Sequence, residues 1–146
     1  MIVVEQSNHH YKEENMTSES QPAPISGKML WAGRILSTLP VLMLLMSGVM
    51  KLMKPPELVE GFTKLGWPDN LALGLGIVEL VCTALYVIPR TSVLGAILLT
   101  GYLGGAIATH VRIGDPFIGP VIFGVMIWLG LVLRDVRLRA LLPLRR

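Results

Sequence analysis

The amino-acid sequence predicts an all-α fold: a bundle of four transmembrane helices with a short amphipathic interfacial segment between the first and second helices. Composition is the first reason, because 52% of the 146 residues are hydrophobic and only 16% are charged, whereas soluble domains are about 25% charged. Length is the second reason. A bilayer core requires about 20 apolar residues per helix, and the apolar chain after residue 28 has room for four such helices with short connections.

Residues 1–28 are predicted to form a disordered cytoplasmic tail. This stretch mixes Glu and Lys with Ser, Asn, Gln and Pro and has no apolar periodicity, so it cannot bury enough surface to offset the entropy of ordering. It also lacks the succession of basic, apolar and small residues that marks a secretory signal. Met16 opens an ordinary N-terminal sequence, Met-Thr-Ser-Glu-Ser, so both Met1 and Met16 are kept as candidate start sites.

The first transmembrane helix is predicted over residues 29–51, just before Lys54 and a pair of prolines. At 100° per residue its polar side chains fall on one stripe, together with small and apolar residues. The stripe consists of Arg34, Ser37, Val41, Leu44, Gly48 and Lys51. The first helix therefore presents its polar groups to one side.

The amphipathic segment is predicted over residues 55–67, because apolar residues at helical spacing from Leu58 to Leu65 lie opposite Glu and Lys. A Gly-Trp-Pro sequence then ends this segment and opens the second transmembrane helix, predicted over residues 68–89. One stripe of the second helix is small and polar, and it is expected to face the other helices. This stripe consists of Ala72, Gly76, Glu79, Thr83 and Tyr86.

The third and fourth transmembrane helices are predicted over residues 92–111 and 117–133, separated by a Gly-Asp-Pro sequence that ends one helix and starts the next. The third helix carries small residues four positions apart, a pattern that lets helices approach closely in lipid. These are Gly101 with Gly105, and Thr100 with Gly104 and Ala108. We expect them to pack against a neighbouring helix. The four helices form one domain over residues 29–135, and residues 136–146 follow as a basic cytoplasmic segment.

The distribution of basic residues predicts the orientation. With four crossings, the N-terminal tail, the turn at 90–91 and the C-terminus share one side, and the connection at 52–67 meets the turn at 110–115 on the other side. Most of the 13 Lys and Arg residues fall on the first side. They are Lys12, Lys28, Arg34, Arg90, Arg134, Arg137, Arg139, Arg145 and Arg146. By the positive-inside rule, both termini are expected in the cytoplasm.

Composition also argues against several kinds of site. The net charge of +3 comes largely from the arginines of the C-terminal run, which are explained by topology and by contact with anionic lipid, so we expect no nucleic-acid partner. Cys82 is the only cysteine, which excludes a disulfide within the chain and a four-cysteine metal site. No histidine or cysteine stands at ligand spacing from His110, so we expect no metal centre.

Glu79 is the most informative single residue, because it falls near the middle of the second predicted helix. A carboxylate there costs several kcal/mol unless it is protonated or paired, so it is a candidate functional group. Arg34 of the first helix is the favoured partner, whereas Lys51 and His110 lie nearer the outer end. The alternatives are a structural Arg34–Glu79 pair that fixes helix register and a polar pocket that holds a small ligand or relays protons.

Several short pieces of the sequence, in this order and spacing, resemble one family pattern. The pieces are Arg34, Ser47-Gly48-x-x-Lys51-Leu52, Phe62-x-x-Leu65-Gly66-Trp67-Pro68, Gly76-x-x-Glu79-Leu80 and Tyr102-x-x-Gly105-Ala-x-x-Thr-His110-x-Arg112. On these residues, residues 29–135 resemble the DoxX-like family of small four-helix membrane proteins. The resemblance implies a multi-pass protein of the bacterial cytoplasmic (inner) membrane, with recurring polar positions at Arg34, Lys51, Glu79 and His110.

The resemblance also frames the expected function. Some relatives are described as subunits of a thiosulfate:quinone oxidoreductase and others as partners in membrane redox or as assembly factors. We expect an accessory or partner-binding subunit of a membrane redox system, with a candidate polar pocket of Arg34, Lys51, Glu79, His110 and Arg112 and with a quinone as the implied cofactor. A stand-alone thiol–quinone oxidoreductase needs paired cysteines, which this chain lacks. The alternatives are a small-molecule or proton-coupled permease that acts as a homo-oligomer and a membrane-protein assembly factor.

Overall fold

The computed structural model describes residues 26–68 and 70–141, and these residues form helices without any β-strand. The all-α prediction is therefore confirmed for the described chain. The helices are α2 (Gly27–Met53), α3 (Pro56–Lys64), α4 (Leu71–Val87), α5 (Ser92–Ile113), α6 (Ile118–Arg134) and α7 (Val136–Leu141). The predicted tail lies outside the described residues except for its last three positions, of which residues 27–28 begin α2. Both candidate start sites and residues 142–146 also lie outside the described chain.

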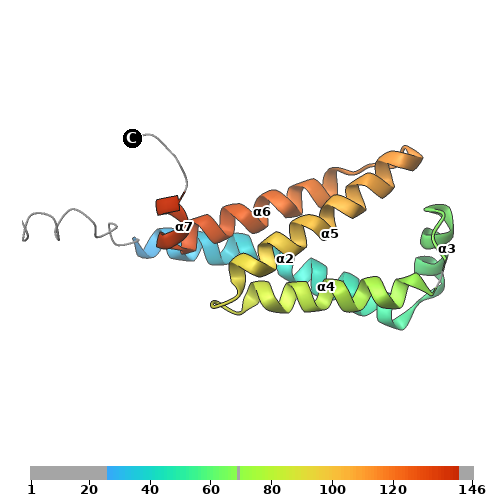
Figure 1. Ribbon diagram of the computed structural model, residues 1–146, viewed down its shortest axis with the longest axis horizontal. Helices are drawn as coiled ribbons and strands as arrows, with labels where there is room; N and C mark the ends of the chain where they lie inside the picture. The colour runs from blue at the N-terminus through green and yellow to red at the C-terminus, as the bar shows by residue number, and fades with distance from the viewer. Residues whose placement is uncertain (1–25, 69, 142–146) are drawn as a thin grey trace, which may run out of the picture.

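The four long helices, α2, α4, α5 and α6, pack around a common core. The helix α2 packs against α4 and α6, and α5 packs against the same two helices. The start of α2 and the short helix α7 lie at one end of the molecule, and α3 lies at the opposite end (Figure 1). The sequence prediction that the 52–67 connection meets the 110–115 turn is confirmed, because Lys64 forms an ion pair with Asp115.

The core of the half of the molecule nearer α7 is closely packed. Tyr86, Leu99, Ile127 and Leu131 are almost completely buried. The Tyr86 hydroxyl donates to the Ile127 carbonyl oxygen at 2.9 Å, and because this uses its single proton, the Ser37 hydroxyl donates to Tyr86, also at 2.9 Å. Gly95 permits this packing, because a side chain there would collide with the backbone of Tyr86.

Gly101, Gly104 and Gly105 of α5 do not bring helices together within the chain, contrary to the sequence prediction. A Cβ atom added at Gly101, Gly104 or Gly105 would have no neighbour within 4 Å. The reason is the orientation of α5 about its own axis. Its core-facing side carries Ala96, Leu99 and Leu103, so the side with these glycines faces outward. Close approaches occur instead at other glycines, including Gly33 with Gly130 and Gly48 with Gly76.

Two helices, α2 and α5, are long and apolar enough to cross a membrane, with mean hydropathy of 1.8 and 1.6 over their most apolar windows. Less than a third of each window is buried, so neither helix resembles the core helix of a soluble protein. The apolar helices α4 and α6 are shorter, at 17 residues each. Pro68 and Pro89 lie outside α4, which is why this helix is shorter than the predicted 68–89 span.

Candidate functional site

A buried ion pair joins α2 and α4. The Lys51 ammonium, in the last turn of α2, lies 2.8 Å from the Glu79 carboxylate, which is near the middle of α4. The Glu79 side chain is 2% exposed and the Lys51 side chain 15% exposed. Gly48 and Gly76 make the pair possible, because a Cβ at Gly76 would lie 3.0 Å from the Gly48 carbonyl oxygen. Only glycine at these positions lets the two backbones come this close.

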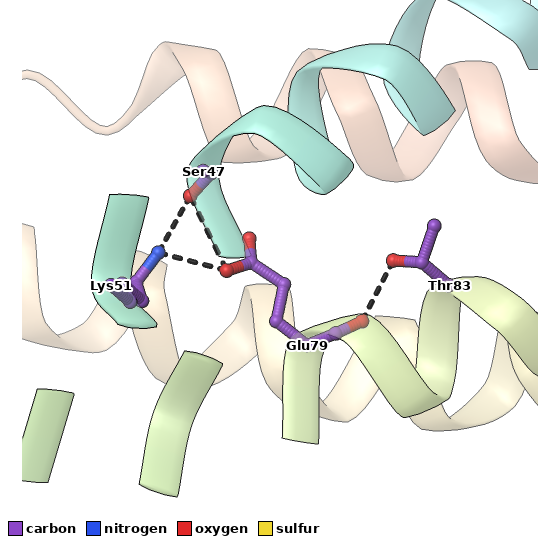
Figure 2. A network of polar contacts seen from close by, with 4 residues as sticks. All are labelled: Ser47, Lys51, Glu79 and Thr83. Atoms are coloured by element: carbon purple, nitrogen blue, oxygen red, sulfur yellow. Dashed lines mark hydrogen bonds and ion pairs between the residues drawn. The ribbon is translucent and has the colours of Figure 1, made fainter. Parts of the chain in front are cut away.

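Ser47 completes the cluster around the ion pair (Figure 2). Its hydroxyl accepts a hydrogen bond from Lys51 at 2.6 Å and donates to the Glu79 carboxylate at 3.3 Å. On the next turn of α4, the Thr83 hydroxyl donates to the Glu79 backbone carbonyl at 2.7 Å. The Glu79 carboxylate therefore has one cationic and one neutral donor, which is the arrangement a buried charge requires.

A cavity of about 550 Å³ lies beside this cluster. Most of its wall is apolar and comes from all four long helices and α3, and its polar groups are Ser47, Lys51, Glu79, Tyr102, Thr109 and His110. The Tyr102 side chain of α5 lies close to the Glu79 carboxylate. A volume of about 300–1,000 Å³ with a mostly apolar wall and a few convergent polar groups is typical of small-molecule sites.

His110 contributes a ring nitrogen to the cavity wall. Its Nδ1 lies 2.7 Å from the Ala106 carbonyl oxygen, one turn earlier in α5. A carbonyl only accepts, so Nδ1 carries the proton of this hydrogen bond. In the neutral ring, Nε2 is then a hydrogen-bond acceptor. His110 thus combines a fixed orientation with a basic atom that the helix does not use.

The structure brings three of the five predicted site residues together. Lys51, Glu79 and His110 line the same cavity, whereas Arg34 and Arg112 are absent from its wall. The predicted Arg34–Glu79 pair is wrong, because Lys51 is the partner of Glu79. Arg34 is exposed, and its guanidinium lies 5.9 Å from the centre of the Trp31 ring.

Helix register explains why Arg34 is remote. The helices α2 and α4 run in opposite directions and meet at Gly48 and Gly76. Moving fourteen residues from Gly48 back to Arg34 corresponds to moving fourteen residues forward from Gly76, which passes the end of α4 at Val87. Arg34 therefore lies at the opposite end of the molecule from the cavity.

Arg112 lies at the cavity end but points toward the segment after α3. Its guanidinium lies 5.4 Å from the centre of the Trp67 ring and donates to the Leu65 carbonyl oxygen. Ser47, Phe62 and Tyr102 line the cavity although the sequence prediction omitted them. The spacing of Ser47 and Lys51, one helical turn apart, was a usable signal for Ser47. Among the described residues, no cluster of His, Cys, Asp and Glu is arranged to hold a metal ion.

Comparison with known families decides the classification. The model of the DoxX-like family matches residues 35–133. The chain belongs to the DoxX-like family. The match includes Lys51, Glu79 and His110 of this DoxX-like protein and begins one residue after Arg34. No curated protein and no solved structure matches the chain. Membership of this membrane-associated family agrees with the two helices that are long and apolar enough to cross a membrane.

Proposed function

We propose that this DoxX-like protein is a four-helix transmembrane protein that binds a small amphipathic molecule in the cavity beside Lys51 and Glu79. In this proposal it acts as an accessory subunit of a membrane redox system, and the bound molecule is a quinone. The observation that carries the proposal is the mostly apolar cavity of about 550 Å³ that ends at a buried ion pair. A closed structural pair would not need this space.

Surface chemistry supports a transmembrane position for all four long helices. Each exposes large apolar side chains to its surroundings, for example Leu42 of α2, Val81 of α4, Ile97 of α5 and Val125 of α6. A helix of 17 residues, such as α4 or α6, is about 25 Å long, which is at the short end of what spans a bilayer. The excess of basic residues beside the chain termini supports an inner-membrane protein with both termini in the cytoplasm.

The chemistry of the cavity fits a quinone head group. The Lys51 ammonium has three N–H donors, and two of them are used by Ser47 and Glu79, so one remains for a carbonyl acceptor. Aromatic rings of Phe62, Trp67 and Phe123 stand in the same wall and offer flat apolar surfaces. Because Lys51 and Glu79 neutralise each other, the site favours a neutral head group over an ionic one.

This chain would bind and orient the quinone. When bound, a quinone supplies reversible transfer of two electrons and two protons within the membrane. Lys51 would polarise a carbonyl oxygen, and the Nε2 atom of His110 would accept or hold a proton at the cavity wall. The only cysteine, Cys82, is buried, so we propose that electrons come from a companion protein and that this chain is not a stand-alone enzyme.

Fluorescence titration with decylubiquinone, a short-chain quinone, tests the binding site. Trp67 lies in the cavity wall, so we expect saturable quenching in the purified protein and a smaller effect in the Trp67→Phe variant. Ala106 also lies in the wall, and Ala106→Phe should fill the cavity and abolish saturable quenching. The matched control is Ala108→Phe, at an exposed position of the same helix. Equal quenching in both phenylalanine variants would reject the quinone site.

Purification in mild detergent tests the accessory role. Mass spectrometry of the intact assembly should detect a companion chain together with retained quinone. Recovery of this chain alone, with neither partner nor quinone, would contradict the proposal. A homo-oligomer without a companion would instead favour the permease alternative.

A further inference from the structure

The helix α3 lines one end of the cavity, and its backbone does not pack tightly on any long helix. Leu58, Gly61 and Phe62 of α3 line the cavity, and Phe62 is 7% exposed. Among the described helices, the extensive helix–helix contacts involve the long helices and α7 but not α3. Figure 1 shows α3 lying across the end of the molecule opposite α7. A few side chains thus hold α3 in place.

Both connections of α3 contain a residue in the left-handed backbone region. Lys54 has φ 50° and ψ 55° after the end of α2, and Gly66 has φ 73° before α4. Left-handed residues commonly end helices, and the backbone N–H groups of Lys54 and Gly66 donate to the carbonyl oxygens of Met50 and Thr63. The segment between them, including α3, is therefore bounded on each side by a short turn. Such element-terminal positions are where hinged segments move.

Polar contacts fasten the end of α3 to the C-terminal end of α5. Lys64 lies 2.9 and 3.0 Å from the two carboxylate oxygens of Asp115, and the two side chains are 67% and 28% exposed. Arg112 adds its hydrogen bond to the Leu65 carbonyl and its contact with the Trp67 ring. We call these five residues the latch. Exposed contacts of this kind are individually weak and easily reversed.

We propose that α3 is a hinged lid and that the latch controls passage between the outer end of the molecule and the cavity. This inference rests on the proposed function for the identity of what passes, because only a ligand-binding cavity needs a lid. The lid has an apolar inner face over the cavity, a short turn at each end, and the latch, whose contacts are weak and reversible. Opening breaks the latch and withdraws Phe62, whereas the packing among the four long helices stays intact.

Cysteine labelling measures lid opening without any ligand. In a Cys82→Ala background the chain has no other cysteine, so Ala106→Cys reports access to the cavity wall and Glu57→Cys reports the exposed side of α3. The reagent is 2-sulfonatoethyl methanethiosulfonate, a charged thiol reagent, applied in mild detergent. We expect Ala106→Cys to react much more slowly than Glu57→Cys in the protein with an intact latch.

Substitutions in the latch should accelerate labelling of Ala106→Cys in a graded way. Arg112→Gln should increase the rate about tenfold, since it removes a charged hydrogen bond and a cation–π contact. Lys64→Gln should increase it about two- to fivefold, as for an exposed ion pair. Glu60→Gln, at an exposed acid on the same helix, should leave the rate unchanged. The charge swap of Lys64→Asp with Asp115→Lys should restore slow labelling.

Added salt provides a test that needs no latch substitution. High ionic strength screens exposed charges, so it should accelerate labelling while Lys64 and Asp115 are intact and have less effect in Lys64→Gln. The same rate in every variant and at every salt concentration would overturn the lid and indicate access between the long helices. Latch-dependent labelling together with failed decylubiquinone binding would reject the quinone but not the lid.

Discussion

Two buried polar clusters in the described part of the chain differ in charge and in surroundings. In the first, the Ser37 and Tyr86 hydroxyls and the Ile127 carbonyl form a neutral chain of hydrogen bonds in a closely packed core. In the second, Lys51 and Glu79 form an ion pair beside a cavity. A neutral cluster holds helices together at low cost, whereas a buried ion pair is often no better for stability than apolar residues. The comparison therefore supports a structural role for the first cluster and the proposed ligand-binding role for the second.

Removal of Lys51 should produce the largest loss of stability. Lys51→Met leaves the Glu79 carboxylate buried without its cation, and we expect a cost of about 3–5 kcal/mol. The free energy of unfolding can be measured by SDS titration in mild detergent. Lys28→Met, at an exposed lysine of the same helix, is the matched control. A double variant that also carries Glu79→Gln should recover most of the loss, and failure to recover it would show that the two charges do not depend on each other.

Adding a methyl group at the α2–α4 contact should cause the next largest loss of stability. Gly76→Ala would place a methyl group 2.8 Å from the Lys51 Cβ and 3.0 Å from the Gly48 carbonyl oxygen, and we expect overpacking to cost about 1–3 kcal/mol. Gly105→Ala is the control, because a Cβ there meets nothing within 4 Å. It should leave stability unchanged or raise it by about 0.5–1 kcal/mol. Equal losses in the two variants, measured by the same titration, would mean that α5 contacts another chain at Gly105.

Two tyrosine variants compare the clusters directly. Tyr86→Phe removes the hydroxyl that bonds Ile127 and Ser37, and we expect a loss of about 1–3 kcal/mol because buried partners are left unpaired. Its decylubiquinone binding should be normal. Tyr102→Phe should show the reverse, with near-normal stability and weaker binding, since this side chain lines the cavity. If both variants changed stability and binding alike, the division between the clusters would be wrong.

Substitution of Arg34 should have the smallest effect on stability. Arg34 is exposed and lies beyond the end of α4, so Arg34→Gln should change the free energy of unfolding by less than about 0.5 kcal/mol. Normal decylubiquinone binding is expected as well. A loss comparable to that of Lys51→Met would restore Arg34 as a partner of the buried acid.

The sequence predicted the helices well because apolar runs and Gly or Pro breaks are local signals. The described helix α2 extends the predicted first helix by two residues at each end. The inward face of α4 was also predicted, since Ala72, Gly76 and Glu79 are all buried.

Contacts between helices were predicted less well. Arg34 and Lys51 lie on the same stripe of the first helix, so periodicity could not decide which of them meets Glu79. That choice depends on the register between helices, which Gly48 and Gly76 set. The glycines of α5 were assigned to tight packing because small residues alone do not show which neighbour they face. The cavity depends on α3 as well as on the long helices, and no local pattern specifies that arrangement.

The unequal lengths of α2 and α4 have a consequence for the surrounding lipid. The 27 residues of α2 extend over about 40 Å and the 17 residues of α4 over about 25 Å. In the proposed orientation, the hydrocarbon layer thins where it meets α4, because local thinning accommodates a helix shorter than the bilayer. Bilayers with shorter acyl chains should therefore accommodate the protein with less distortion, and its distribution between thick and thin membranes would follow from this difference in helix length.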